Sequence, residues 1–265
     1  MNLLHLADLS AQDVHTLWSL ADSGPAPPLP GTVAWSFEGP GIRTRAAFLQ
    51  AFRDLGLACT ELPNLLQSSE RVEDLAGYLD PFFSLYVIRA ADHDRLSAFA
   101  AASQRPVVNA MSRRGHPCEV LTDAWFIERS VKPLQAATVC LWGPTTNVFR
   151  SWHELAGVLG FRLVQVCAAR HHEPGGAVHF TTAPPPQADV VITDAWPAGT
   201  EDDATPLGAE HLRAMGDPLL LPTPPFQVGR ELLVDPRGHP RFAGYAQKQG
   251  LLPMHRAILR FVARA

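Results

Sequence analysis

The sequence has few cysteines, and their placement excludes a disulfide-rich class of protein. Its 265 residues contain four cysteines, at positions 59, 118, 140 and 167. They are scattered, with no CxxC pair and no dense framework. Such spacing predicts reduced, buried thiols in a cytoplasmic protein.

Net charge and long apolar runs are also lacking. The formal net charge is only −4, which argues against a nucleic-acid partner bound by bulk electrostatics. No apolar run approaches the ~18 residues of a membrane span, and the N-terminus lacks the basic-then-apolar design of an export signal. What is present, 46% hydrophobic and 18% charged residues, is typical of a globular protein with ample core in one large or two modest domains.

The most informative stretch runs from Phe37 to Gly56. A β-rich run, 32–37, ends in Gly39-Pro40-Gly41 and is followed by an amphipathic helix with Phe48, Ala51, Phe52 and Leu55 on one face. A strand, a glycine turn and a helix start aim free backbone N–H groups and the positive end of the helix at one point. Arg43, Thr44 and Arg45 crowd the first turn of this helix. The pattern predicts a pocket for a phosphate or a carboxylate.

Other elements of the first half place further polar groups near that edge. Residues 2–22 read as an opening helix, with Ser10 as N-cap and Asp13 three places on. A third apolar strand, 82–88, ends in Arg89, and a buried arginine at the carboxyl end of a strand is costly unless it is paired or faces a ligand. After the short strand 105–109, His116 stands just before a helix, at the same end of the sheet.

A second α/β unit begins near residue 137. It reads as a strand (TVCLW), a helix over 151–159 and the strand RLVQVC, without the GxGxxG of a dinucleotide site. His171, His172, Glu173 and His179 are read as solvated side chains on a Gly/Pro-rich connector rather than as a metal group. The acidic run 201–203 is read as a solvated loop or helix start.

Several of these stretches resemble one family. Phe37-Glu38 followed by Arg43-Thr44-Arg45 resembles the F-x-x-x-S-[TLM]-R-T-R loop of the aspartate/ornithine carbamoyltransferases, and the matches include IRA at Arg89, PVVNA, His116-Pro117, Asn147 and ADVVITDAW. The resemblance covers nearly the whole chain and is closest to the ornithine and acetylornithine branch. The chain departs from the family pattern with Gly41 for serine, Ile42 for threonine, leucine or methionine, Glu119 for glutamine, and Leu251 for arginine.

The resemblance implies an α/β fold of two Rossmann-like domains with parallel sheets. Residues 1–132, rejoined by a C-terminal helix within 246–265, would form a carbamoyl-phosphate-binding domain, and 133–245 an amino-acceptor domain. It implies catalytic roles for Arg43, Arg89 and His116. Substrate contacts would come from Gly41, Ile42, Thr44, Glu119, Asn147, Asp194 and Leu221.

The implied activity is transfer of a carbamoyl group from carbamoyl phosphate to an amine of an ornithine-like rather than aspartate-like acceptor. Two alternatives stay open at this point: the same scaffold acting on another phosphorylated or phosphonate donor, and a non-catalytic paralogue that serves as a binding or scaffold protein. The resemblance also implies a homotrimer with small-molecule substrates and with neither a metal nor an organic cofactor. Composition and charge predict a cytoplasmic protein with no nucleic-acid or membrane partner.

Overall fold

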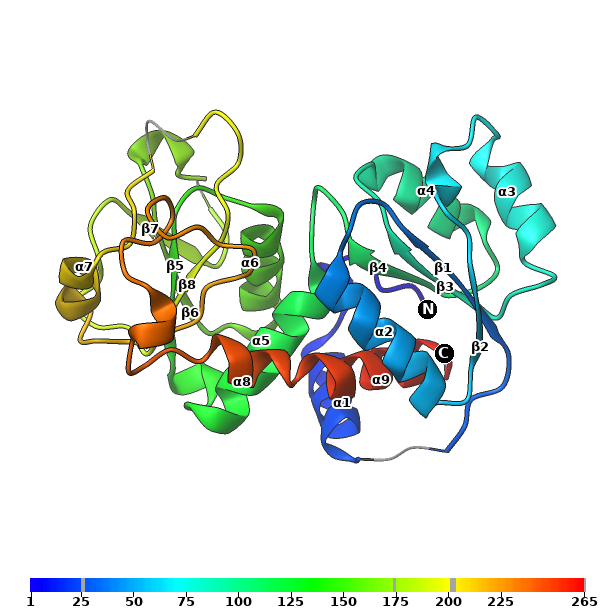
Figure 1. The fold of residues 1–265 in the computed structure, drawn as a ribbon, viewed down its shortest axis with the longest axis horizontal. Helices are drawn as coiled ribbons and strands as arrows, with labels where there is room; N and C mark the ends of the chain where they lie inside the picture. The colour runs from blue at the N-terminus through cyan, green and yellow to red at the C-terminus, as the bar shows by residue number, and fades with distance from the viewer. Residues whose placement is uncertain (25–26, 174, 201–203, 265) are drawn as a thin grey trace. The chain divides into compact units, whose positions relative to one another are not determined.

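The computed structural model describes residues 1–24, 27–173, 175–200 and 204–264 (Figure 1). The acidic run 201–203 lies outside these residues. The chain forms two compact units: Met1–Thr122 with Gly250–Ala265 is unit 1, and Asp123–Gln249 is unit 2. This division falls inside helix α5 (Pro117–Ser130), before the predicted boundary at residue 132.

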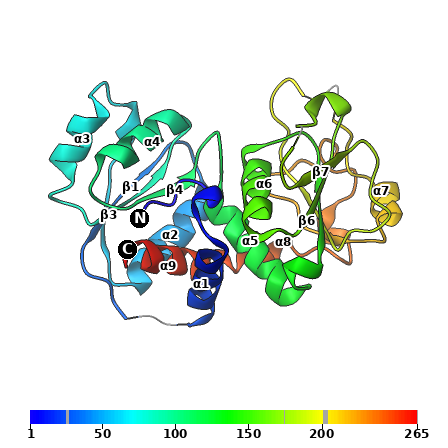
Figure 2. The ribbon, with the colours of Figure 1, turned by 180° about the vertical axis from the view of Figure 1, so that it is seen from behind.

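Unit 1 is built on a four-stranded sheet in the order β2-β1-β3-β4, in which every pairing is parallel. Helices cover both faces, as parallel sheets require. In both views α1, α2 and α9 lie on one face while α3 and α4 lie on the other (Figures 1 and 2). The elements are β1 (Thr32–Phe37), β2 (Ala58–Glu61), β3 (Leu85–Arg89), β4 (Val107–Met111), α1 (Ala11–Asp22), α2 (Ile42–Asp54), α3 (Val72–Leu79), α4 (His93–Ala102) and α9 (Leu251–Val262).

Unit 2 is built on a five-stranded parallel sheet in the order β7-β6-β5-β8-β9. Its strand order reverses between β5 and β8, and α6 and α7 lie on opposite faces (Figures 1 and 2). The elements are β5 (Thr138–Trp142), β6 (Arg162–Val166), β7 (Val178–Thr181), β8 (Val190–Thr193), β9 (Leu219–Leu220), α6 (Asn147–Leu159), α7 (Ala209–Ala214) and α8 (Gly244–Lys248). The two parallel sheets confirm the predicted α/β class.

The opening helix is shorter than predicted. The predicted cap at Ser10 is confirmed, because Ser10 and Asp13 form a reciprocal capping box at the start of α1. The helical prediction for residues 2–10 is wrong, apart from a short 3₁₀ turn at Leu6–Asp8. Leu3 instead forms a β-bridge with Val108 of β4, so tertiary pairing overrides the local helical pattern.

Two predictions in unit 2 also differ from the structure. Helix α6 begins at Asn147 rather than Ser151, because the Thr146 side chain caps it by accepting from Phe149 N at 3.2 Å. The connector predicted around His179 is in part a strand, since β7 pairs with β6. Among the described residues, no helix is both long and apolar enough to cross a membrane.

Helix α9 buries an unusual histidine against α2. His255 is fully buried and its ring stacks on Phe48 with 3.9 Å between centroids. Neither ring nitrogen has a hydrogen-bond partner among the described residues. Burial lowers the pKa of His255 from 6.5 to about 3.

His255→Leu is therefore expected to stabilise the protein by about 1–2 kcal/mol, because it removes two unsatisfied buried polar atoms and keeps apolar bulk. The unfolded chain binds a proton on His255 between pH 6.5 and 3, whereas the folded chain does not. Stability should thus fall as the pH falls through this window, by up to about 1.4 kcal/mol per pH unit from this group. Urea unfolding from pH 7 to pH 4 measures both effects.

The control is His15→Leu, at an exposed position on α1. It should leave the acid dependence unchanged, while His255→Leu should flatten it. An unchanged dependence in His255→Leu would contradict this account.

Candidate functional site

The turn between β1 and α2 has the geometry of an anion site. Gly41 is the N-cap of α2, with φ 40° and ψ 37°, and no side chain caps the helix there. The first-turn N–H groups of this helix of 13 residues are therefore not occupied by a cap. A positive φ at the cap suits glycine, which carries no Cβ to clash.

Arg89 lies directly against this turn. It ends β3 at the register position opposite Phe37, and Glu38 N donates to its carbonyl at 2.8 Å. A Cβ built on Gly41 would come within 3.1 Å of Arg89 Cδ and Nε and 3.3 Å of Cζ. The Arg89 side chain thus occupies the space beside the glycine cap.

Two guanidinium groups lie close together here. Burial and then the positive charge of Arg43 lower the pKa of Arg89. Arg89 Nε is buried and has no hydrogen-bond partner among the described residues. Two repelling cations and a buried unfilled donor beside a helix N-terminus favour a bound dianion such as phosphate.

Arg45 has a different environment. Its guanidinium pairs with Glu61 at 3.2 Å and lies over the rings of Trp35 and Phe37, 5.0 and 5.7 Å from the centroids. These contacts anchor the first turn of α2 to β1 and β2. Of the neighbouring predicted residues, Thr44 is buried while Ile42 is 71% exposed.

His116 and Glu119 lie one strand further along the sheet. Arg89 of β3 is in register with Met111 of β4, and the chain leaves β4 through a turn in which Ser112 N donates to Gly115 O at 2.8 Å. His116 and Glu119 follow this turn and are both buried. That His116 and Glu119 reach the same ligand as Arg89 stays a prediction.

In unit 2, Asn147 and Asp194 lie at the same edge of the sheet. Asn147 follows β5 and Asp194 follows β8, which is its parallel neighbour. Thr146 links them, because it caps α6 at Asn147 and also hydrogen-bonds to the Asp194 carboxylate. The third predicted contact, Leu221, is buried just after β9, and its N donates to Val191 O at 2.9 Å.

Asp194 belongs to a buried acidic cluster that sequence reasoning missed. Burial above all raises its pKa to about 6, and the negative charge of Glu231 raises it further. Asp123, hydrogen-bonded by Gln247, is also buried, and its pKa is raised well above the usual value by burial and by Asp194. Asp123 is the last residue of the short LTD run that follows His116. This local pattern gives no indication that Asp123 lies near Asp194 in the fold.

The histidines predicted to be solvated are only partly so. His171 and His172 are half-buried, and His172 Nε2 lies 3.2 Å from Cys167 O. Glu173 and His179 are exposed, as predicted. Within the described ranges, no group of three or more His, Cys, Asp or Glu residues could hold a metal ion.

Comparison with known proteins places the chain among enzymes of one kind. The sequence model of the aspartate/ornithine carbamoyltransferase carbamoyl-P binding domain matches residues 1–129. Ornithine carbamoyltransferase of Mesorhizobium japonicum is 32% identical over 226 residues, covering 78% of this chain and 70% of the relative. That of Methanopyrus kandleri is 29% identical and covers 97% of this chain and 96% of its own length.

Among solved structures, ornithine carbamoyltransferase from Thermus thermophilus matches with a TM-score of 0.90 and 24% identity, covering 98% of each chain. At this identity the match establishes the fold, and it confirms the predicted two-domain architecture over the length of the chain.

Proposed function

The chain belongs to the aspartate/ornithine carbamoyltransferase family, and from this membership we propose that it transfers a carbamoyl group from carbamoyl phosphate to the amine of an ornithine-like acceptor. The observation that carries the proposal is the buried Nε of Arg89, which has no hydrogen-bond partner among the described residues and lies beside Gly41 and Arg43. A small dianion bound at the start of α2 would accept a hydrogen bond from the unfilled donor and would offset the repulsion between the two cations.

Carbamoyl transfer makes few covalent demands on a protein. The acceptor nitrogen attacks the carbamoyl carbon, and an oxyanion develops. The C–O bond to phosphate then breaks, phosphate leaves with the electron pair, and the attacking nitrogen gives up a proton that the departing phosphate takes. The protein has to hold both reactants in line and stabilise the developing charges.

In the proposed mechanism the donor half comes from unit 1. Arg43, Arg89 and the main-chain N–H groups of the first turn of α2, at Gly41, Ile42 and Thr44, hold the phosphate. His116 donates to the carbamoyl oxygen. The Glu119 carboxylate accepts from the carbamoyl NH₂ group, where the family carries a glutamine.

The acceptor half comes from unit 2. Asp194 receives a cationic group of the acceptor, Asn147 donates to or accepts from its polar end, and the main chain at Leu221 completes the contact. No metal or organic cofactor takes part in these steps. The buried acids around Asp194 favour a cationic acceptor over an aspartate-like one.

Asp194→Asn is expected to raise the acceptor KM by about tenfold, because it removes one charge-assisted hydrogen bond. The pKa of Asp194 is raised to about 6. Since only the carboxylate holds a cation well, acceptor affinity of the unaltered protein should weaken as the pH falls through 6. Acceptor KM measured from pH 5 to 7.5 should lose this dependence in Asp194→Asn, and a variant that keeps it would contradict the role of Asp194.

The proposed activity is tested by calorimetry with carbamoyl phosphate and inorganic phosphate, followed by mass detection of ureido products from a panel of diamino acids. Binding of carbamoyl phosphate and a ureido product from an ornithine-like acceptor are expected. Binding without turnover across the panel would favour a scaffold protein. Binding of phosphonates but not of carbamoyl phosphate would favour another donor.

We further propose a cytoplasmic homotrimer. All four cysteines are free thiols, which fits a reducing compartment, although Cys59 is exposed and not buried as predicted. Unit 1 exposes Tyr78 and Phe82 at 74% and 70% of their surface, and large exposed apolar side chains of this kind fit a subunit contact. Light scattering on the purified chain measures the assembly, and a monomer at micromolar concentration would contradict it.

A further inference from the structure

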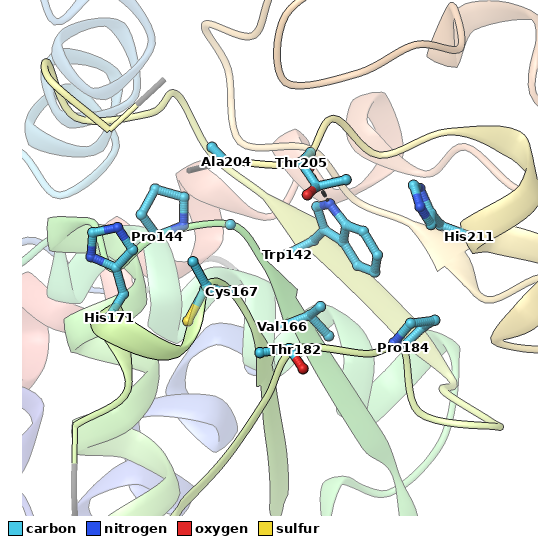
Figure 3. A pocket seen from close by; sticks show the side chains of 12 residues that line it. Trp142, Pro144, Val166, Cys167, His171, Thr182, Pro184, Ala204, Thr205 and His211 are labelled. Carbon is cyan, nitrogen blue, oxygen red and sulfur yellow. Dashed lines mark hydrogen bonds between the residues drawn. The ribbon is translucent and has the colours of Figure 1, made fainter. Parts of the chain in front are cut away.

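Unit 2 contains a small cavity outside the residues assigned to the transfer reaction. It has a volume of about 250 Å³ and lies at the carboxyl ends of β5, β6 and β7 (Figure 3). In this view Pro144 and His171 stand at one end and His211 at the other, with Trp142 and Cys167 between them (Figure 3). Neither Asn147 nor Asp194 is among the described residues that line it.

The described residues of the lining include three planar rings, those of Trp142, His171 and His211. Among the described residues that form its walls there is no aspartate, glutamate, lysine or arginine. The Trp142 indole is held in one orientation, because its Nε1 donates to Thr205 O at 2.7 Å and its ring packs on His211 with 4.6 Å between centroids. A fixed aromatic wall with imidazoles suits a flat, uncharged ring better than an ion.

One buried donor beside the cavity has no acceptor. Trp196 is 8% exposed, and its Nε1 has no hydrogen-bond partner among the described residues. This nitrogen lies 3.2 Å from the Cβ position of Gly143, and Gly143 lines the cavity. Because Gly143 has no side chain, no Cβ stands between the indole N–H and that wall, and an acceptor atom on a ligand beside Gly143 would satisfy this donor.

The position in the fold agrees with a ligand site. Ligands of doubly wound sheets bind outside the carboxyl ends of the strands. Dinucleotide-binding folds use an acidic residue after a strand to hold a ribose. Here β6 is followed by Cys167, and burial raises the pKa of this thiol to about 11, so the thiol stays neutral. The volume is below the ~300–1,000 Å³ of most ligand pockets, which limits the ligand to about one ring system.

We propose that this cavity binds a neutral planar heteroaromatic ring of the nucleobase type, at a site separate from the transfer reaction. The ring lies against Trp142 between the two imidazoles, and one of its acceptor atoms takes the Trp196 N–H. A phosphate group on the ligand should not increase its affinity, since none of the described residues that line the cavity is a lysine or an arginine.

Saturation-transfer NMR and calorimetry on the full chain test the proposal, with purine, adenosine, adenosine monophosphate and indole at millimolar concentrations. Purine and adenosine should bind, and the monophosphate should bind no more tightly than adenosine. Absence of binding by both purine and adenosine overturns the proposal, as does a monophosphate that binds more than tenfold more tightly.

Thr182→Trp fills the cavity from its exposed rim and should abolish binding, while Thr60→Trp, at an exposed position on β2, should not. If adenosine binds Thr182→Trp with unchanged affinity, it binds at another place, and the proposed site is wrong. Trp196→Phe should weaken adenosine about two- to tenfold through loss of one hydrogen bond and leave indole, which has no ring acceptor, unchanged. Equal weakening of both ligands overturns the assigned donor.

Discussion

Arg43→Ala is expected to lower kcat/KM for carbamoyl phosphate by about 10²–10³-fold, the loss typical of removing one preorganised donor to developing charge. Arg43 is close enough to lower the pKa of Arg89, so the two guanidinium groups form one positive site. Arg43→Ala removes one of the two positive charges that stabilise the departing phosphate, and with it one planar fork that can bind phosphate through two N–H groups. Steady-state kinetics and calorimetry with phosphate measure the loss.

The matched control is Arg53→Ala. Arg53 is an exposed arginine in the last turn of the same helix, so this variant also removes one positive charge from α2 but far from its N-terminus. It should leave kcat/KM within a few-fold of the unaltered value. If Arg53→Ala and Arg43→Ala lose activity equally, the effect comes from net charge rather than from the site, and the role of Arg43 is wrong.

Arg43→Lys separates charge from geometry. A lysine keeps the positive charge but binds phosphate as a point charge rather than as a planar fork. Partial recovery relative to Arg43→Ala is expected. Full recovery would mean that the charge alone acts, without two-point binding.

The donor half of the site was largely predictable because its signals are local. Strand, glycine turn and helix follow one another within 32–54, and the structure has β1 and α2 at these positions. The carboxyl ends of parallel strands share one edge, so Arg89 at the end of β3 could be placed near that turn from periodicity alone.

What could not be predicted depends on tertiary neighbours. The segment 2–10 has a helical pattern, but Leu3 pairs with β4, a partner more than a hundred residues away. Glu231 raises the pKa of Asp194, although the two are far apart in sequence and no motif joins them. The half-buried setting of His172 likewise depends on β7, because its ring packs on Phe180 with 5.6 Å between centroids, and the Gly/Pro-rich sequence did not predict this strand.

For Gly41, which stands where the family has a serine, the sequence motif and the structure predict opposite effects of glycine on activity. From the family motif alone, glycine at this position reads as the loss of a donor to phosphate. In the structure, Arg89 packs closely against this position, and its Nε and Cδ would lie 3.1 Å from a Cβ at Gly41. A serine side chain at this position would therefore crowd the Arg89 guanidinium.

Gly41→Ser, which restores the family residue, is therefore expected to lower kcat/KM by about 10²-fold rather than raise it, because a small displacement of a positioning group is costly in a preorganised site. The new Cβ meets the Arg89 side chain and forces it to move. The φ of 40° adds backbone strain for any residue other than glycine.

Gly39→Ser is the matched control, because Gly39 has a φ of 71° and nothing lies within 4 Å of its Cβ position. It carries the same kind of backbone strain, so it should lose about 1 kcal/mol of stability but keep its activity. In an Arg89→Ala background, Gly41→Ser should cause little further loss, because the group that it displaces is already absent. If Gly41→Ser keeps its activity, or if it lowers kcat/KM equally with and without Arg89, then Arg89 does not take over the role of the family serine.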